Sequence, residues 1–156
     1  MTRLATSARL ITTADLWSRI TNASPTATLK GHHSKEVLNR FRLCDPSPQA
    51  FLLLDVRSCI EVERSGMILG AQVLPSYYLY YALTQTPDKL MATFGMAYPE
   101  KHQLIVCYAD DGQRAGDAHT TLSYLGFRNV RTYKEGIEGF RSAYPHLIGK
   151  LPIANE

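Results

Sequence analysis

The sequence predicts an α/β domain in which a central parallel sheet of about five strands is covered by helices on both faces. Short and nearly continuous apolar runs, such as 51–56 and 104–108, are typical of strands that are buried on both sides. These runs alternate along the chain with segments of helical periodicity, which favours parallel strands joined by helices. A length of 156 residues suits a single domain with its own core.

The spacing of apolar residues and turn residues places each element. Strands are expected at Leu10 and over 51–56, 71–74, 104–108 and 129–133. Helices are expected after an N-cap at Thr13 and over 35–43, 60–64, 77–83, 89–94, 114–125 and 137–143. The single domain then comprises a basic N-terminal region with an insertion (1–50), a core (51–145) and a C-terminal tail (146–156).

The positive charge is concentrated near the N-terminus. Residues 1–50 carry seven Lys and Arg against three Asp and Glu, whereas residues 51–156 carry ten against eleven. Such a region is either a solvated face or a contact for an acidic partner, with Lys35 and Arg40 as candidate contacts. Nucleic acid is not expected, because the basic residues are dispersed and not interleaved with aromatic ones. No apolar run approaches the roughly 18 residues of a membrane span.

The cysteines indicate neither a disulfide framework nor a metal site. Cys44, Cys59 and Cys107 are scattered, no CxxC spacing occurs, and His32-His33 stands apart from them. We interpret each of these cysteines as a small buried apolar residue of an intracellular protein and expect no metal or cofactor.

The most informative loop follows the strand 104–108 and leads into the helix 114–125. Ligands of open parallel sheets bind at the carboxyl ends of the strands. A helix N-terminus also collects unpaired backbone N–H groups, which suit an anion or a thiolate.

Three segments of the second two thirds of the chain occur in a characteristic order. They are Leu54-Asp55-Val56-Arg57 followed by Glu61, then 105–115, then 126–130 with 135–140. Together they resemble the rhodanese (sulfurtransferase) family, which implies the rhodanese three-layer fold. The family's active members carry a cysteine directly after the loop tyrosine, and Tyr108, Gly112 and Arg114 match that motif without gaps. The cysteine position is then Ala109, so the resemblance implies a loop without its nucleophile.

The remaining loop residues also depart from the active pattern. Asp110 and Asp111 fill the two variable positions, and Ala115 replaces a serine. The acidic pair either complements the helix dipole or forms an acidic patch that docks a basic partner or a divalent ion. It would also raise the pKa of a nearby thiol and repel thiosulfate, although Arg114 could offset one charge. The vestigial loop therefore comprises Ala109, Asp110, Asp111, Gly112, Gln113 and Arg114.

Cys107 is the alternative nucleophile. It lies two residues before Ala109 and points to the same side of the strand, but deeper in the sheet. A thiosulfate-type sulfurtransferase that uses Cys107 is therefore the second hypothesis. A relative of phosphatases or arsenate reductases is the third.

Two further groups of residues invite a structural role or a binding role. Asp55 and Arg57 are expected to form an internal ion pair near a strand end. Tyr77, Tyr78, Tyr80 and Tyr81 form a dense cluster that either packs over the sheet or anchors an interface, with Tyr77 and Tyr78 as contacts.

A narrower resemblance concerns three short stretches. Tyr108-Ala109-Asp110-Asp111, the stretch 118–121 and the segment 144–152 resemble the rhodanese-like domain of centrosomal and ciliary tubulin-modification-associated proteins. That group also carries acidic residues in the loop. The resemblance implies a non-catalytic, cytoplasmic module of the cilium, axoneme or centrosome, with tubulin or another microtubule-associated protein as partner.

Overall fold

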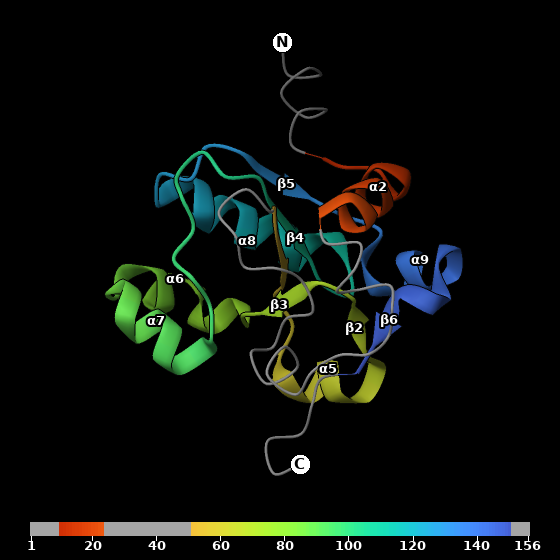
Figure 1. The fold of residues 1–156 in the computed structure, drawn as a ribbon, viewed down its shortest axis with the longest axis horizontal. Coiled ribbons are helices and arrows are strands. Elements are labelled where there is room, and N and C mark those ends of the chain that lie inside the picture. Colours follow the sequence, from red (N-terminus) through yellow and green to blue (C-terminus); the bar gives the residue numbers. More distant parts are fainter. Residues whose placement is uncertain (1–9, 24–50, 151–156) are drawn as a thin grey trace.

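The computed structural model describes residues 10–23 and 51–150, and its centre is a four-stranded parallel sheet (Figure 1). The strands lie in the order β3-β1-β4-β5. They span Leu52–Asp55 (β1), Ala71–Val73 (β3), Ile105–Tyr108 (β4) and Val130–Thr132 (β5). The predicted α/β class and the parallel sheet are confirmed. The pairing of Asp55 with Tyr108 brings the carboxyl ends of β1 and β4 side by side.

The predicted sheet of about five strands is larger than the one observed. In the described part of the chain the fifth strand is reduced to a single parallel bridge between Leu10 and Thr132. The chain turns into helix α2 (Thr13–Ala23) immediately afterwards. The predicted N-cap is displaced by one residue, because the Asp15 N–H donates to Thr12 Oγ1 at 3.1 Å. Thr13 instead shares a 2.8 Å hydrogen bond with the Tyr133 hydroxyl.

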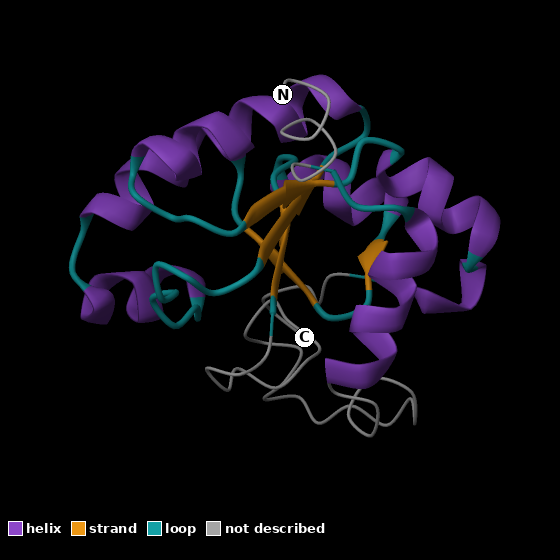
Figure 2. Ribbon diagram, turned by 90° about the horizontal axis from the view of Figure 1, so that it is seen from above, coloured by secondary structure: helices purple, strands orange, loops and turns teal. Residues whose placement is uncertain are grey.

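Helices cover both faces of the sheet, as predicted (Figure 2). One face carries α6 (Ser76–Thr84), α7 (Pro87–Phe94) and α8 (Gly112–Tyr124), and the other carries α2, α5 (Cys59–Ser65) and α9 (Gly136–Ala143). Alternate strand residues feed the two cores: Leu54 packs among the residues of α6 to α8, whereas Leu53 packs among those of α2, α5 and α9. No described helix has both the length and the apolar character that a membrane span needs.

A second, two-stranded sheet lies beside α5. Its antiparallel strands are β2 (Met67–Ile68) and β6 (Ile148–Gly149), and a 3-10 turn, η1 (Pro145–Leu147), precedes β6. The predicted C-terminal tail, 146–156, therefore begins inside the fold. At Gly66 the backbone takes a φ of +81°, and a Cβ there would lie 2.9 Å from the Gly149 carbonyl oxygen. Only glycine permits this close approach. The predicted helix 35–43, with Lys35 and Arg40, lies outside the described residues.

Candidate functional site

The predicted loop joins β4 to α8 at the carboxyl edge of the sheet. Ala109 is completely buried, and its carbonyl accepts a hydrogen bond of 2.9 Å from the Ile137 N–H. Gly136, at the start of α9, lies so close that a Cβ there would be 2.7 Å from the carbonyl oxygens of Ala109 and Asp110. The backbone of the loop is therefore packed against the start of α9, and the position of the family's nucleophile is enclosed.

The N-terminus of α8 is capped by a side chain of the loop itself. Asp111 Oδ1 accepts hydrogen bonds from the backbone N–H groups of Gln113, at 3.0 Å, and Arg114, at 3.1 Å. These are the donors that the sequence suggested for an external anion or thiolate. The carboxylate of Asp111 is thus an internal anion in that place, and the helix-dipole interpretation of the acidic pair is confirmed for Asp111.

Arg114 holds two carboxylates at once. Its guanidinium binds Glu61 in a bidentate manner, at 2.8 Å to Oε1 and 2.7 Å to Oε2. The Nη2 atom also donates to Asp110 Oδ1 at 2.6 Å. Hydrogen bonds from Arg114 lower the pKa of Glu61 to about 2 and that of Asp110 below its usual range. Both acids are therefore ionised at neutral pH, and the one arginine faces two negative charges.

Glu61 has a second role that fixes this arrangement. Its Oε1 accepts from the Ser58 N–H at 3.0 Å, and its own N–H donates to Ser58 Oγ at 3.2 Å, which forms a capping box at the start of α5. Arg114 thus ties α5 to α8. No partner for Glu61 is predicted from the sequence. The spacing from Ser58 to Glu61 was a signal for the helix start, but no local signal indicates Arg114.

Asp55 and Arg57 form the predicted internal ion pair, which is confirmed. Arg57 Nε lies 2.9 Å from Asp55 Oδ1, and Nη2 lies 2.6 Å from Oδ2. Arg57 also donates to Ser65 Oγ at 2.5 Å and to the Gly66 carbonyl at 2.7 Å. Burial alone would lower the pKa of Arg57, but Asp55 raises it. Because Arg57 is 1% exposed, this arginine is a structural anchor and not an anion-binding group.

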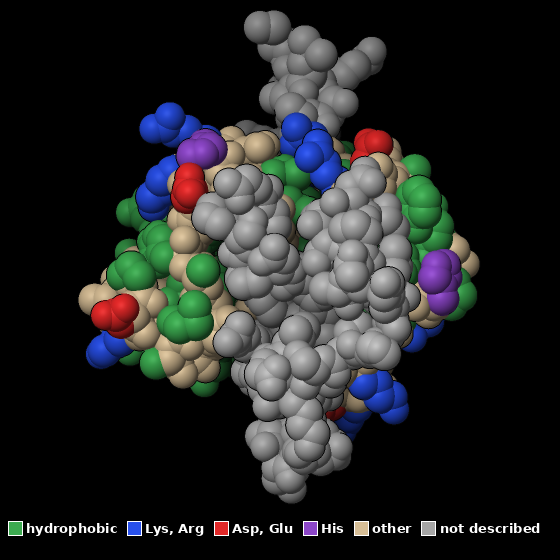
Figure 3. Space-filling view, in the orientation of Figure 1, with side chains coloured by type: hydrophobic (Ala, Val, Ile, Leu, Met, Phe, Trp, Pro, Cys, Tyr) green, Lys and Arg blue, Asp and Glu red, His purple; other side chains and the backbone are tan. Residues whose placement is uncertain are grey.

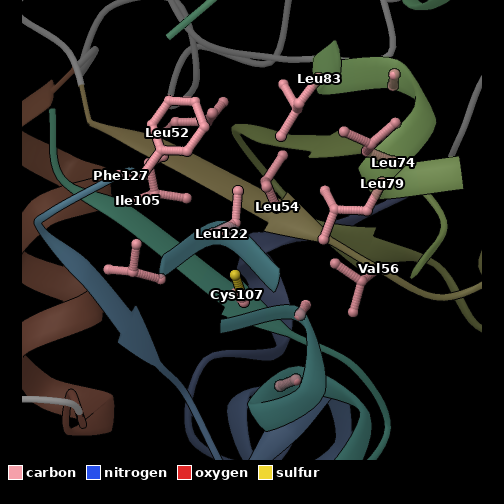
Figure 4. Packing of buried hydrophobic residues seen from close by; sticks show 14 of the residues in the cluster. Leu52, Leu54, Val56, Leu74, Leu79, Leu83, Ile105, Cys107, Leu122 and Phe127 are labelled. Carbon is pink, nitrogen blue, oxygen red and sulfur yellow. The ribbon is translucent and has the colours of Figure 1, made fainter. Parts of the chain in front are cut away.

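Cys107 lies deep in the sheet, as predicted. It is completely buried and packs among side chains of β1 and α8 (Figure 4). Burial raises the pKa of its thiol to about 12, so the thiolate is scarce at neutral pH. Cys59 on α5 is exposed, so the prediction that it is buried is wrong. Partial burial and the charges of Glu63 and Asp55 still raise the pKa of its thiol. Neither thiol in the described part of the chain is activated; Cys44 lies outside it.

The tyrosine cluster is exposed, so its interpretation as packing over the sheet is wrong. Tyr77, Tyr78, Tyr80 and Tyr81 are 66%, 47%, 54% and 59% exposed. Helix α6 instead buries Leu79, Ala82 and Leu83. Tyr78 has ring contacts with Tyr77, at 4.7 Å between centroids, and with Phe94 of α7, at 6.1 Å. Tyr77 and Tyr78 thus lie on an exposed surface of α6 beside α7.

Comparison with known proteins identifies the fold. The family model of the rhodanese-like domain matches residues 35–143. A human single-domain sulfurtransferase has a TM-score of 0.64 at 20% identity, over 86% of this chain and 96% of that one. The Saccharomyces cerevisiae single-domain sulfurtransferase has a TM-score of 0.64 at 17% identity, over 90% and 94%. A comparison with curated proteins gives no match.

A further similar structure is that of a possible tyrosine phosphatase. This protein of unknown function from Rhodopseudomonas palustris has a TM-score of 0.54 at 19% identity, over 90% of this chain and 85% of that one. At these identities the three likenesses concern the fold, and the chemistry has to be argued from the loop.

Proposed function

The chain belongs to the rhodanese-like domain family, and we propose that it is a catalytically silent member that acts by binding other proteins. One observation carries the proposal. The position of the family's cysteine is the buried Ala109, and the adjoining helix N-terminus is capped by the chain's own Asp111.

Sulfur transfer needs a thiolate that attacks the sulfur donor and holds the transferred sulfur as a persulfide. An alanine has no atom that does this. The N–H groups that would lower the pKa of such a thiol already bind Asp111, and Arg114 already binds Glu61 and Asp110. Replacing Ala109 by cysteine therefore restores the thiol but not the environment that would activate it.

The alternative nucleophile, Cys107, has less support. Its thiol lies in the core between the sheet and α8, and its pKa of about 12 leaves about one thiol in 10⁵ ionised at pH 7. Sulfur donors would reach it only after the loop and the start of α8 had separated from the sheet. No observation favours the phosphatase-type alternative, since that chemistry also needs an activated nucleophile in this loop.

The setting is proposed from the narrower resemblance. Similarity to the rhodanese-like domain of centrosomal and ciliary proteins supports a place in the cilium, axoneme or centrosome, with tubulin or another axonemal protein as partner. The basic N-terminal region would suit an acidic surface on such a partner. Co-fractionation of the protein with isolated axonemes tests this; a protein that stays entirely in the soluble fraction contradicts it.

Thiocyanate formation from thiosulfate and cyanide tests the catalytic half of the proposal, with the human single-domain sulfurtransferase as positive control. We expect no thiocyanate above the protein-free background from the wild-type chain or from Ala109→Cys. Turnover by the wild type that Cys107→Ser abolishes would overturn the proposal.

A triple variant, Ala109→Cys with Asp110→Ser and Asp111→Ser, separates the missing thiol from the acidic environment. Serine keeps a helix-capping oxygen at 111 but removes its charge. We expect its introduced thiol to react faster with thiosulfate than that of Ala109→Cys alone. If Ala109→Cys alone turns over, the acidic pair is not inhibitory and only the missing thiol accounts for the silence.

A further inference from the structure

An open cleft of about 500 Å³ lies beside the end of α5, where it meets α9 and β6. Its lining includes Arg64, Ser65, Arg141, Ile148, Gly149 and Lys150. None of these residues belongs to the loop between β4 and α8. In the space-filling view Lys and Arg side chains, with a few acidic atoms beside them, lie at the lower right edge of the molecule (Figure 3).

The charges of this cleft are not balanced. Three cationic side chains line it, Arg64, Arg141 and Lys150, and none of its lining residues in the described part of the chain is acidic. Of these three cations, only Arg141 has a carboxylate partner among the described residues: Glu138, whose side chain is 68% exposed and lies 3.2 Å away. Since like charges that share a concave surface raise its positive potential, the cleft attracts anionic groups from solution.

The floor of the cleft is held in place from inside the fold. Arg57 binds the Ser65 hydroxyl and the Gly66 carbonyl, and Arg141 donates to the Ser65 carbonyl. Gly66 packs against Gly149 of β6. The two sides of the cleft are therefore joined through buried contacts, so that Arg64 and Lys150 project from a fixed frame. Such preorganisation reduces the entropy lost when a ligand binds.

We propose that this cleft binds a carboxylate-rich segment of a partner protein. The cations come from α5, from α9 and from the residue after β6, around an open space. This arrangement suits several carboxylates along a peptide better than one small ion. Arginine forks bind carboxylates in a bidentate manner, and the exposed edges of Pro145 and Ile148 offer apolar contact between the charges. The proposal rests on the protein-binding half of the proposed function and gives the partner a chemical class.

Fluorescence anisotropy of a labelled deca-glutamate peptide, titrated with the full chain at 50 mM salt, tests the cleft. The test variant is Arg64→Glu with Lys150→Glu. Arg141 is kept, because its guanidinium also supports the Ser65 carbonyl. The matched control, Lys89→Glu with Arg128→Glu, makes the same change in net charge at exposed positions outside the cleft. We expect the test variant to weaken binding at least tenfold and the control less than twofold.

Equal weakening in both variants would overturn the proposal, because binding would then follow net charge alone. Undiminished binding by the test variant would also overturn it and would place the peptide elsewhere, for example on the basic N-terminal region. Inorganic phosphate that displaces the peptide at matched ionic strength and low millimolar concentration would identify a small-anion site instead. Thiocyanate formation by a chain whose cleft still binds the peptide would overturn the proposal of catalytic silence and leave the cleft proposal standing. A wild-type chain that neither binds the peptide nor forms thiocyanate would overturn the cleft proposal and leave catalytic silence standing.

Discussion

The loop between β4 and α8 and the cleft beside α5 differ in what faces their arginines. In the loop, Arg114 binds Glu61 and Asp110, both from its own chain. In the cleft, Arg64 and Lys150 have no carboxylate partner among the described residues, and Arg141 shares one exposed carboxylate. A cation whose partners are supplied by the fold gains little from an external anion, whereas an unbalanced one gains more. The family's catalytic loop is therefore the less suitable binding surface here.

Helix α5 takes part in both regions, although it spans only Cys59–Ser65. Its first turn supplies Glu61 to the network of Arg114. Its last residues supply Arg64 and Ser65 to the cleft. The buried Arg57 binds Asp55 at the end of β1 and the Gly66 carbonyl after α5. The position of α5, which contributes to both regions, thus depends on one anchor that holds it against the sheet.

Removing this anchor is expected to have the largest effect. Arg57→Leu leaves the buried carboxylate of Asp55 without its partner, which should lower the free energy of unfolding by about 3–5 kcal/mol. Urea unfolding measures the loss. The double variant Asp55→Asn with Arg57→Leu should recover part of it, because the unpaired charge is then removed. A loss below about 1 kcal/mol, as for an exposed ion pair, would show that Arg57 does not anchor α5.

Much of the fold is predictable because its signals are local. The apolar run 51–56 and the periodicity of the later helices place β1, α6, α7, α8 and α9 within a few residues of their observed bounds. The Asp55–Arg57 pair is also local, since two residues separated by one position at a strand end can meet. The assignment of Ala109 to the family's cysteine position depends only on aligning a motif without gaps. The structure places Ala109 directly after β4.

The contacts that define the two regions are not local. Glu61 and Arg114 are 53 positions apart, and β2 and β6 are two-residue strands too short to show periodicity. Neither the network of Arg114 nor the cleft therefore has a pattern in the sequence. The prediction for the tyrosines of α6 is wrong for another reason. A tyrosine has both an apolar ring and a polar hydroxyl, so the spacing of tyrosines does not distinguish an exposed helix face from a buried one.

Alanine substitutions at two glycines test how tightly the loop between β4 and α8 is packed. Gly136 has a φ of +69°, and a Cβ there would lie 2.7 Å from two loop carbonyl oxygens. Gly136→Ala should therefore lower the free energy of unfolding by about 2–3 kcal/mol. In the matched control, Gly116→Ala, nothing lies within 4 Å of the added Cβ. This helical substitution should stabilise the fold by about 0.5–1 kcal/mol. Equal stability of the two variants would mean that the loop has room to move.

The smallest expected effect tests the balance of charge in the loop. The folded-state pKa of Glu61, about 2, lies below its ordinary value of 4.5, because Arg114 favours the ionised form. The interaction therefore stabilises the fold fully at neutral pH, and its contribution is lost as the pH falls from about 4.5 towards 2. Since the Glu61 side chain is 37% exposed, solvent screening reduces this contribution to about 1 kcal/mol.

Glu61→Gln should remove that dependence. Unfolding free energies at pH 6 and pH 3 should differ less in the variant than in the wild type, by about 1 kcal/mol. The control Glu63→Gln removes a carboxylate from the same helix without touching Arg114, so its difference should match that of the wild type. If Glu61→Gln and the wild type lose stability equally, Arg114 is not neutralised by Glu61. The loop would then keep an available cation, and its contrast with the cleft would disappear.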